Sequence, residues 1–118
     1  MSDIQTMDNG RYIVPGLARG LRLLQSFTRE SPELGPGDLA RALDLPRTTV
    51  FRLLHTLEAM GFVQKVPGAR TYRLGPAVLG LGFEYLSDLE LPEVARPILE
   101  ALRNIYRAES LVRELMGP

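Results

Sequence analysis

The chain has 118 residues, of which 45% are hydrophobic and 24% are charged, a composition typical of one globular domain or of a small domain with a helical arm. It contains no cysteine and a single histidine, His55, which excludes disulfides, thiolate zinc sites and histidine-rich metal sites. The first ten residues are polar and do not resemble a signal peptide, and no apolar run approaches the roughly 20 residues of a membrane span. We therefore expect a cytoplasmic protein.

The net charge is zero, but the charges are unevenly distributed. Residues 1–75 carry ten basic and seven acidic side chains, whereas residues 76–118 carry four basic and seven acidic ones. Thirteen of the fourteen basic residues are arginine, the side chain that binds phosphates and guanine edges through two hydrogen bonds at once. A basic first part and an acidic second part predict separate roles.

A flexible arm is expected at residues 1–14, followed by a helix at about 16–29. Its apolar stripe is predicted to contain Leu17, Leu21, Leu24 and Phe27, together with Ala18. Breakers at 31–32 and 35–37 predict a loop, in which Leu34 forms a very short strand.

Two further helices are predicted on either side of a tight turn at 44–45. The first, about 37–43, has Asp38 near its N-terminus. The second begins with Pro46 as its first residue, runs to about 60 and stops at Gly61. Its predicted core side carries Val50, Leu53, Leu54 and Leu57, and its other side carries Arg47, Phe51, Arg52 and His55.

Segments 62–66 and 71–74 alternate as short strands, and the turn at 67–70 makes them a hairpin. Helices are then expected at about 76–89 and at about 92–107 or longer. Their predicted apolar faces carry Val78, Leu81, Tyr85, Leu86 and Leu89 in the first, and Val94, Ile98, Leu102, Ile105, Leu111 and Leu115 in the second. These faces should form a dimer interface or an intramolecular core.

This order of elements predicts a mainly α fold with a small β-hairpin wing, a winged helix-turn-helix. We expect the DNA-binding domain at 15–75, and a linker helix and helical arm at 76–118. The third helix would enter the DNA major groove, and the free N–H groups at its start suit phosphate oxygens. The candidate DNA-binding residues are Arg19, Arg47, Thr48, Thr49, Arg52, His55, Arg70 and Arg73.

Several of these side chains have alternative structural roles. One of Thr48 and Thr49 is expected to cap the helix while the other faces DNA. Packing of Phe51 on the first helix is favoured over contact with a thymine methyl group. His55 is expected at the surface rather than as a metal ligand.

The remaining arginines also have alternatives. Arg70 and Arg73 contact DNA or simply keep the edge of the hairpin soluble. Arg19 and Arg22 contact phosphate or pair with carboxylates, and pairing is favoured for Arg22.

The sequence resembles the N-terminal part of IclR-type transcriptional regulators over about residues 12–100. The resemblance is carried by an ordered set of motifs: LARGL at 17–21, DLA at 38–40, LPRTTVFRLL at 45–54, LEAMGFV at 57–63 and YRLGP at 72–76. The segment YIVPGLARG at 12–20 is similar to the branch of that family that controls aromatic-acid catabolism.

The resemblance implies a homodimer that binds a palindromic operator in double-stranded DNA, with a linker helix leading to an effector-binding domain. The sequence departs from the family pattern after about Leu102 and ends where that domain would begin. We therefore expect no small-molecule effector for this chain, and no effector-site residue is carried over. No cofactor or metal is implied.

An enzymatic function is not expected, because the sequence offers neither a Ser-His-acid set nor a glycine-rich phosphate loop. Two alternatives to a regulated DNA-binding protein remain. The chain could be a winged-helix module for protein interaction, which its zero net charge and acidic second part favour. It could also be an unregulated fragment that competes with a full-length relative for the operator.

Overall fold

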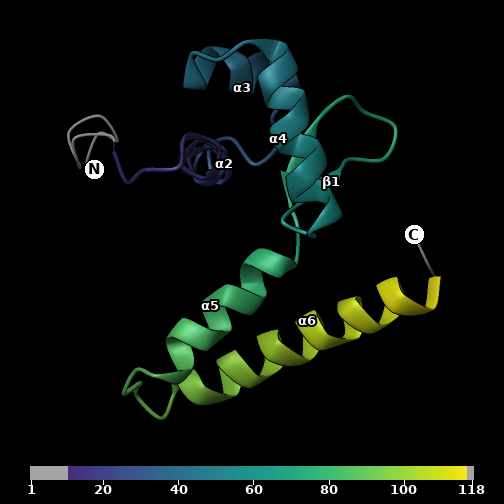
Figure 1. Cartoon of the computed structure of the whole chain (residues 1–118). Coiled ribbons are helices and arrows are strands. Elements are labelled where there is room, and N and C mark those ends of the chain that lie inside the picture. Colours follow the sequence, from purple (N-terminus) through teal and green to yellow (C-terminus); the bar gives the residue numbers. More distant parts are fainter. Residues whose placement is uncertain (1–10, 117–118) are drawn as a thin grey trace. The chain divides into compact units, whose positions relative to one another are not determined.

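Between residue 11 and Leu74, three helices and a hairpin form the described part of the first of two structural units, and the second unit begins at Gly75 (Figure 1). The computed structural model describes residues 11–116. In chain order the unit contains the helices α2 (Pro15–Gln25), α3 (Pro36–Leu43) and α4 (Arg47–Ala59), followed by the antiparallel strands β1 (Val63–Lys65) and β2 (Tyr72–Leu74). The predicted helical fold with a hairpin wing is confirmed. Most of the arm predicted at 1–14 lies outside the described residues.

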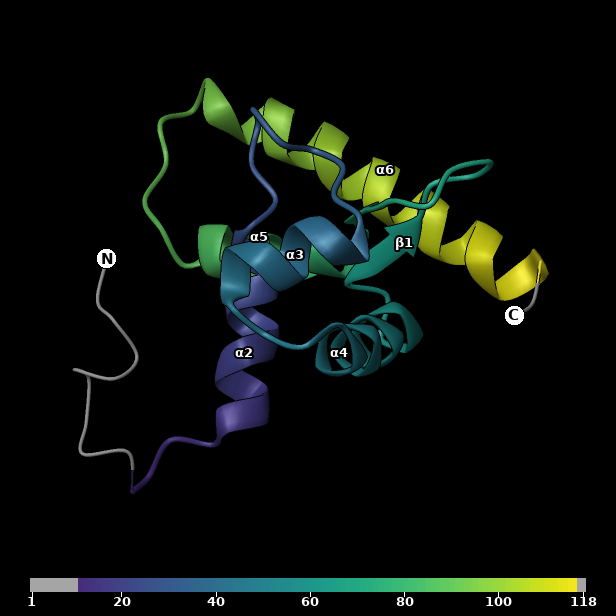
Figure 2. The same ribbon diagram turned by 90° about the horizontal axis from the view of Figure 1, so that it is seen from above.

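The core of this unit lies where the three helices meet the hairpin. Figure 2 looks almost along α4 and shows α2, α3 and the hairpin arranged around it. The buried core side chains are Leu23, Phe27, Leu39, Leu43, Val50, Leu54, Val63 and Tyr72. The predicted core side of α4 is confirmed, because Val50 and Leu54 are fully buried while Leu53 and Leu57 pack against them.

The predicted stripe of α2 is partly wrong. Leu17 and Leu21 are 63% and 52% exposed, whereas Leu23, which the prediction omitted, is completely buried. The helix also ends at Gln25 rather than near 29. Both stripes have helical spacing, and the choice between them depends on the partner: Gly20 is buried and faces Leu53 of α4, so the side of α2 that carries Gly20 and Leu23 faces the core.

Local backbone chemistry explains where α3 and α4 begin and end. Asp38 Oδ2 accepts a hydrogen bond from the Gly35 N–H at 2.9 Å, as expected of a residue at the start of α3. Asp44 then adopts a left-handed conformation with φ of 54°, which aspartate tolerates better than most residues and which ends α3. The predicted stop at Gly61 is confirmed: its φ is 85°, and the Phe62 N–H reaches back to the Leu57 carbonyl at 2.8 Å.

The hairpin is short but attached to the rest of the unit. β1 and β2 pair Val63 with Leu74, and Lys65 with Tyr72. Leu34 adds a single antiparallel bridge to Tyr72, through two backbone hydrogen bonds of 2.8 and 3.0 Å, which confirms the very short strand predicted there. Because Tyr72 is itself buried, this bridge ties the wing to the loop before α3.

The second unit consists of α5 (Ala77–Ser87) and α6 (Ala95–Met116), which diverge from their connecting loop (Figure 1). Phe83, the buried side chain of α5, meets the ring of Tyr106 edge-on at 6.0 Å between centroids. Arg103 lies over the same phenyl ring at 5.5 Å and donates a hydrogen bond to Ser87 Oγ at 2.7 Å. Gly80 makes this approach possible, because a Cβ there would lie 2.6 Å from the Tyr106 hydroxyl oxygen.

The apolar faces predicted for this unit are mostly exposed, so they do not form an intramolecular core, whereas the alternative of a dimer interface stays a prediction. Leu81 and Tyr85 are 63% and 67% exposed, and the buried Phe83 was not on the predicted face. In α6 no described residue is buried, and Ile98 and Ile105 are about three-fifths exposed. Between residues 11 and 116, none of the helices combines the length and apolar character needed to cross a bilayer.

Candidate nucleic-acid interface

One side of α4 is exposed along its first three turns. Helical spacing places residues 48, 51, 52 and 55 on a single face, away from the buried Val50 and Leu54, and Arg47 lies at the edge of this face in the first turn. All five of these side chains are exposed, and two of them, Arg47 and Arg52, are permanently charged cations. Thr49 is only half-buried because it lies at the border between this face and the core.

The start of α4 leaves backbone donors without helical partners. The first intrahelical acceptor is the Pro46 carbonyl, which binds the Val50 N–H at 3.1 Å. Pro46 is therefore the N-cap, whereas the sequence predicted it as the first helical residue. The predicted capping of the helix by Thr48 or Thr49 is also wrong. Their side chains lie beyond the N-cap position, where a hydroxyl cannot reach the N–H groups of the same turn in capping geometry. The N–H groups of residues 47–49 remain available to an external acceptor.

The prediction that Phe51 packs against the first helix is wrong. Half of its side chain (51%) is exposed, and it is absent from the core cluster. It lines a cavity formed by α3, α4 and the hairpin, in which no residue of α2 takes part. Leu53, two residues on, takes the place on the α2 side.

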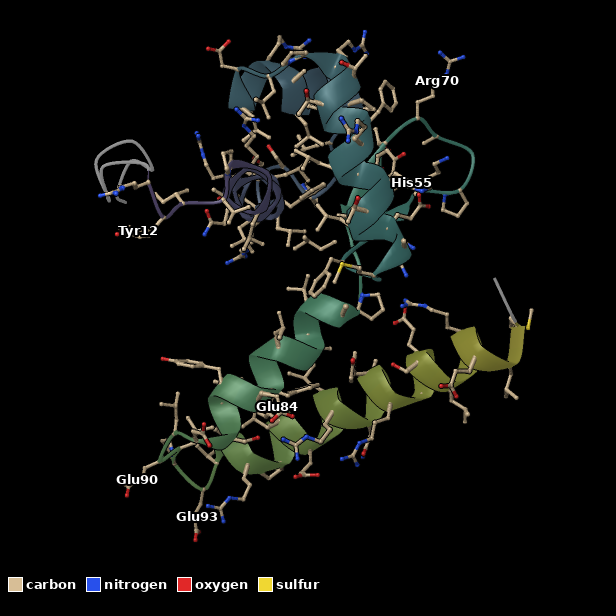
Figure 3. The ribbon with its side chains drawn as sticks, viewed as in Figure 1. Tyr12, His55, Arg70, Glu84, Glu90 and Glu93 are labelled. Atoms are coloured by element: carbon tan, nitrogen blue, oxygen red, sulfur yellow. The ribbon has the colours of Figure 1, made fainter. Side chains whose placement is uncertain are left out.

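This cavity has a volume of about 600 Å³ and a basic lining. It brings together Arg47 from the start of α4 and Arg70 from the hairpin loop, two of the predicted DNA-binding residues. Arg41 of α3 and Lys65 of β1 also line it, and Asp38 is the one acidic residue of the lining. Figure 3 shows the side chain of Arg70 extending outward from the hairpin loop.

Gly37 controls how closely the cations approach α3. A Cβ at this position would lie 3.1 Å from Arg47 Nη2 and 3.6 Å from Arg41 Nη1, so both guanidinium groups lie against the same stretch of backbone. Asp38 holds Arg41 in place through a 2.6 Å salt bridge. The three remaining cations of the lining, Arg47, Lys65 and Arg70, form no salt bridge with any described residue.

The other predicted site residues lie outside this cavity. Arg52 and His55 are exposed on the same face of α4, further along the helix, and Figure 3 labels His55 there. Arg73 is exposed on β2, where its Nε donates to Gln64 Oε1 at 3.4 Å across the strand pair. Arg19 is exposed on α2 and, like Arg22, forms no salt bridge with a described residue, so the pairing favoured for Arg22 is not found.

The sequence-based candidates did not include Arg41. Arg41 lies on α3, a helix that the sequence indicated only as a packing element, and its charge is opposed by Asp38 one turn earlier. The sequence feature that could have indicated a site beside α3 is the GPG segment at 35–37, because two glycines beside a helix start allow other groups to approach the backbone closely. The proximity of residues 37, 47 and 70 could not be read from their spacing.

Comparison with known proteins identifies the first unit. Residues 16–67 match the IclR helix-turn-helix domain. The HTH-type transcriptional regulator TsaQ1/TsaQ2 of Comamonas testosteroni is 40% identical over 83% of this chain and 35% of its own length. The Pca regulon regulatory protein of Pseudomonas putida is 35% identical over 97% of this chain and 38% of its own length.

Solved structures agree with this relationship. The crystal structure of an IclR family transcriptional regulator from Brucella abortus superposes with a TM-score of 0.66 and 36% identity, over 82% of this chain and 36% of that one. The chain thus spans little more than a third of the length of the relatives it matches. Over residues 16–67, this protein contains a helix-turn-helix domain of the IclR family.

Proposed function

We propose that this chain is a sequence-specific DNA-binding transcriptional regulator that reads an operator with α4. The observation that carries the proposal is the exposed face of α4, which displays Arg47, Thr48 and Arg52 in a domain of the IclR helix-turn-helix type. An α-helix fits the major groove of B-form DNA, where an arginine can bind a guanine edge through two hydrogen bonds. We assign this role to residues 15–75.

The hairpin is proposed to contact the DNA backbone beside the groove. Arg70 lies in its loop and Arg73 on β2, and both are exposed. The unpartnered N–H groups at the start of α4 would bind phosphate oxygens next to the bases that are read. Phosphate contacts of this kind fix the orientation of the helix, whereas contacts to base edges determine the sequence.

The second unit is proposed to join two copies of the chain into a dimer. Exposed apolar side chains occur on α5 and α6 in numbers unusual for a monomer surface, among them Leu81, Ile98 and Ile105. A two-fold dimer would place its recognition helices in two half-sites about one helical turn apart on a palindromic operator. The same exposed faces favour the second candidate, a module whose α5 and α6 bind a different protein.

The first test selects binding sites from randomised duplex DNA at about 150 mM salt, where non-specific electrostatic binding is weak. Enrichment of an inverted repeat supports a dimeric reader, and a single half-site supports DNA reading without stable dimerisation. If no sequence is enriched, the protein-interaction module becomes the better assignment.

The selected operator then tests α4. The double variant Arg47→Ala/Arg52→Ala should bind at least tenfold more weakly, because an arginine that reads a base contributes about 1–3 kcal/mol and one that binds a phosphate contributes a charge-assisted hydrogen bond. The matched control is Arg107→Ala/Arg113→Ala, which removes the same charge from exposed positions of α6. Equal affinities of the two double variants, measured by fluorescence anisotropy, would contradict the assignment of α4.

A further inference from the structure

The basic cavity of the first unit contains more positive charge than its surroundings neutralise. Its lining carries four cations and one carboxylate, and the cations come from three elements that are distant in sequence. Both oxygens of that carboxylate are already used: Asp38 Oδ1 binds Arg41 at 2.6 Å, and Oδ2 accepts the Gly35 N–H at 2.9 Å. An anion is therefore the ligand that this lining best accommodates.

The arrangement around Gly37 gives this anion a defined position. The guanidinium groups of Arg41 and Arg47 converge on the same point of the α3 backbone, because Gly37 has no side chain to separate them. An anion placed at this point would interact with both guanidinium groups at once. Planar guanidinium groups bind phosphate or carboxylate oxygens through paired hydrogen bonds, which chloride cannot accept in the same geometry.

The size and the remaining walls of the cavity favour a phosphate within a chain. About 600 Å³ is far more than a single ion occupies. The half-exposed ring of Phe51 adds an apolar side chain to the lining, suited to the carbon atoms of a sugar. Lys65 and Arg70 complete the lining from the hairpin.

We propose that this cavity binds one phosphodiester group of the DNA backbone and that Arg41 and Lys65 are binding residues for it. The inference rests on the proposed DNA-binding function and deepens it. It assigns Arg47 to the backbone rather than to a base, and it leaves sequence reading to the more distal exposed residues of α4, Arg52 in particular. The cavity then sets the register of α4 along the groove.

The test replaces single phosphates of the selected operator with uncharged methylphosphonates, one position at a time. At one position in each half-site, the full chain should lose about tenfold or more in affinity. The variant Arg41→Ala/Lys65→Ala should bind the unmodified operator more weakly and lose nothing further at that position. Its log–log salt dependence should also fall by about one charge per contact removed, equally on operator and unrelated DNA.

Matched variants separate this effect from general loss of charge or fold. Arg29→Ala removes an exposed cation of the same unit outside the cavity and should keep the methylphosphonate sensitivity of the wild type. Lys65→Gln, a milder change, should show part of the effect with an unchanged melting temperature.

The outcomes distinguish the two proposals. If the wild type binds no duplex DNA, the proposed function fails and the cavity assignment fails with it. If the wild type binds but the double variant remains sensitive at the same phosphates, only the cavity assignment is overturned. A third outcome is read from the nuclear magnetic resonance signal of Gly37. If that signal shifts and saturates with inorganic phosphate but stays unchanged with operator DNA, the cavity binds a free anion, and the assignment to a DNA phosphate is overturned.

Discussion

The two units of this chain differ in where their large apolar side chains lie. Among residues 11–116, eight of the nine buried hydrophobic residues belong to the first unit, and Phe83 is the one in the second. The first unit closes three helices and a hairpin around its core, whereas the second has two helices whose large apolar side chains are mostly exposed. Burial of apolar area is the main source of stability, so the first unit carries most of it within one copy of the chain.

The length of α6 increases this difference. It has 22 residues, against 11 for α5, which corresponds to about 33 Å and about 16 Å at the helical rise per residue. Roughly half of α6 therefore has no α5 beside it. Isolated helical turns are marginal in water, so a partner that covers this half would stabilise it substantially.

The largest expected effect compares one substitution in both units. Leu54→Ala removes a fully buried side chain from the first core and should lower the free energy of unfolding by about 2–5 kcal/mol. Leu81→Ala makes the same change at a 63% exposed position and should cost less than about 1 kcal/mol, measured by urea denaturation at low protein concentration. Equal costs would mean that Leu81 is covered and that the contrast between the units is wrong.

A second comparison tests whether the exposed face of α6 is an interface. Ile98→Asp/Ile105→Asp places two charges on that face and should weaken self-association at least tenfold, because a dimer would have to bury them. Sedimentation velocity over a range of concentrations measures this. Glu100→Lys/Glu109→Lys, which alters exposed charged positions of the same helix, serves as the control. A monomeric wild type would contradict the proposed dimer.

The smallest effect concerns two neighbouring glycines of α5. Gly80→Ala should destabilise the second unit, because the new Cβ would lie 2.6 Å from the Tyr106 hydroxyl oxygen and 2.9 Å from Cζ of the same ring. Gly82→Ala meets nothing within 4 Å and should stabilise the helix by about 0.5–1 kcal/mol. Amide hydrogen exchange in α5 and α6 should therefore become faster in Gly80→Ala and slower in Gly82→Ala. Slower exchange in both variants would show that Tyr106 does not pack against Gly80.

Much of the first unit could be predicted because its signals are local. Glycine at 61 ends α4 where a left-handed residue is required, and the leucine spacing of α4 identifies its core side. The prediction for α2 was less successful because two stripes fit the helical period equally well. Only the presence of α4 beside Gly20 decides that Leu23 is buried and Leu17 is not.

The sequence by itself determined the order of the elements, the two faces of α4 and the family to which residues 16–67 belong. Only the tertiary structure decided which apolar residues are buried and which cations share a cavity. The physical reason is that helical and strand periods describe one segment at a time. Burial of Phe83 against Tyr106, and the meeting of Arg41, Arg47, Lys65 and Arg70, depend on contacts between segments that are distant in the chain.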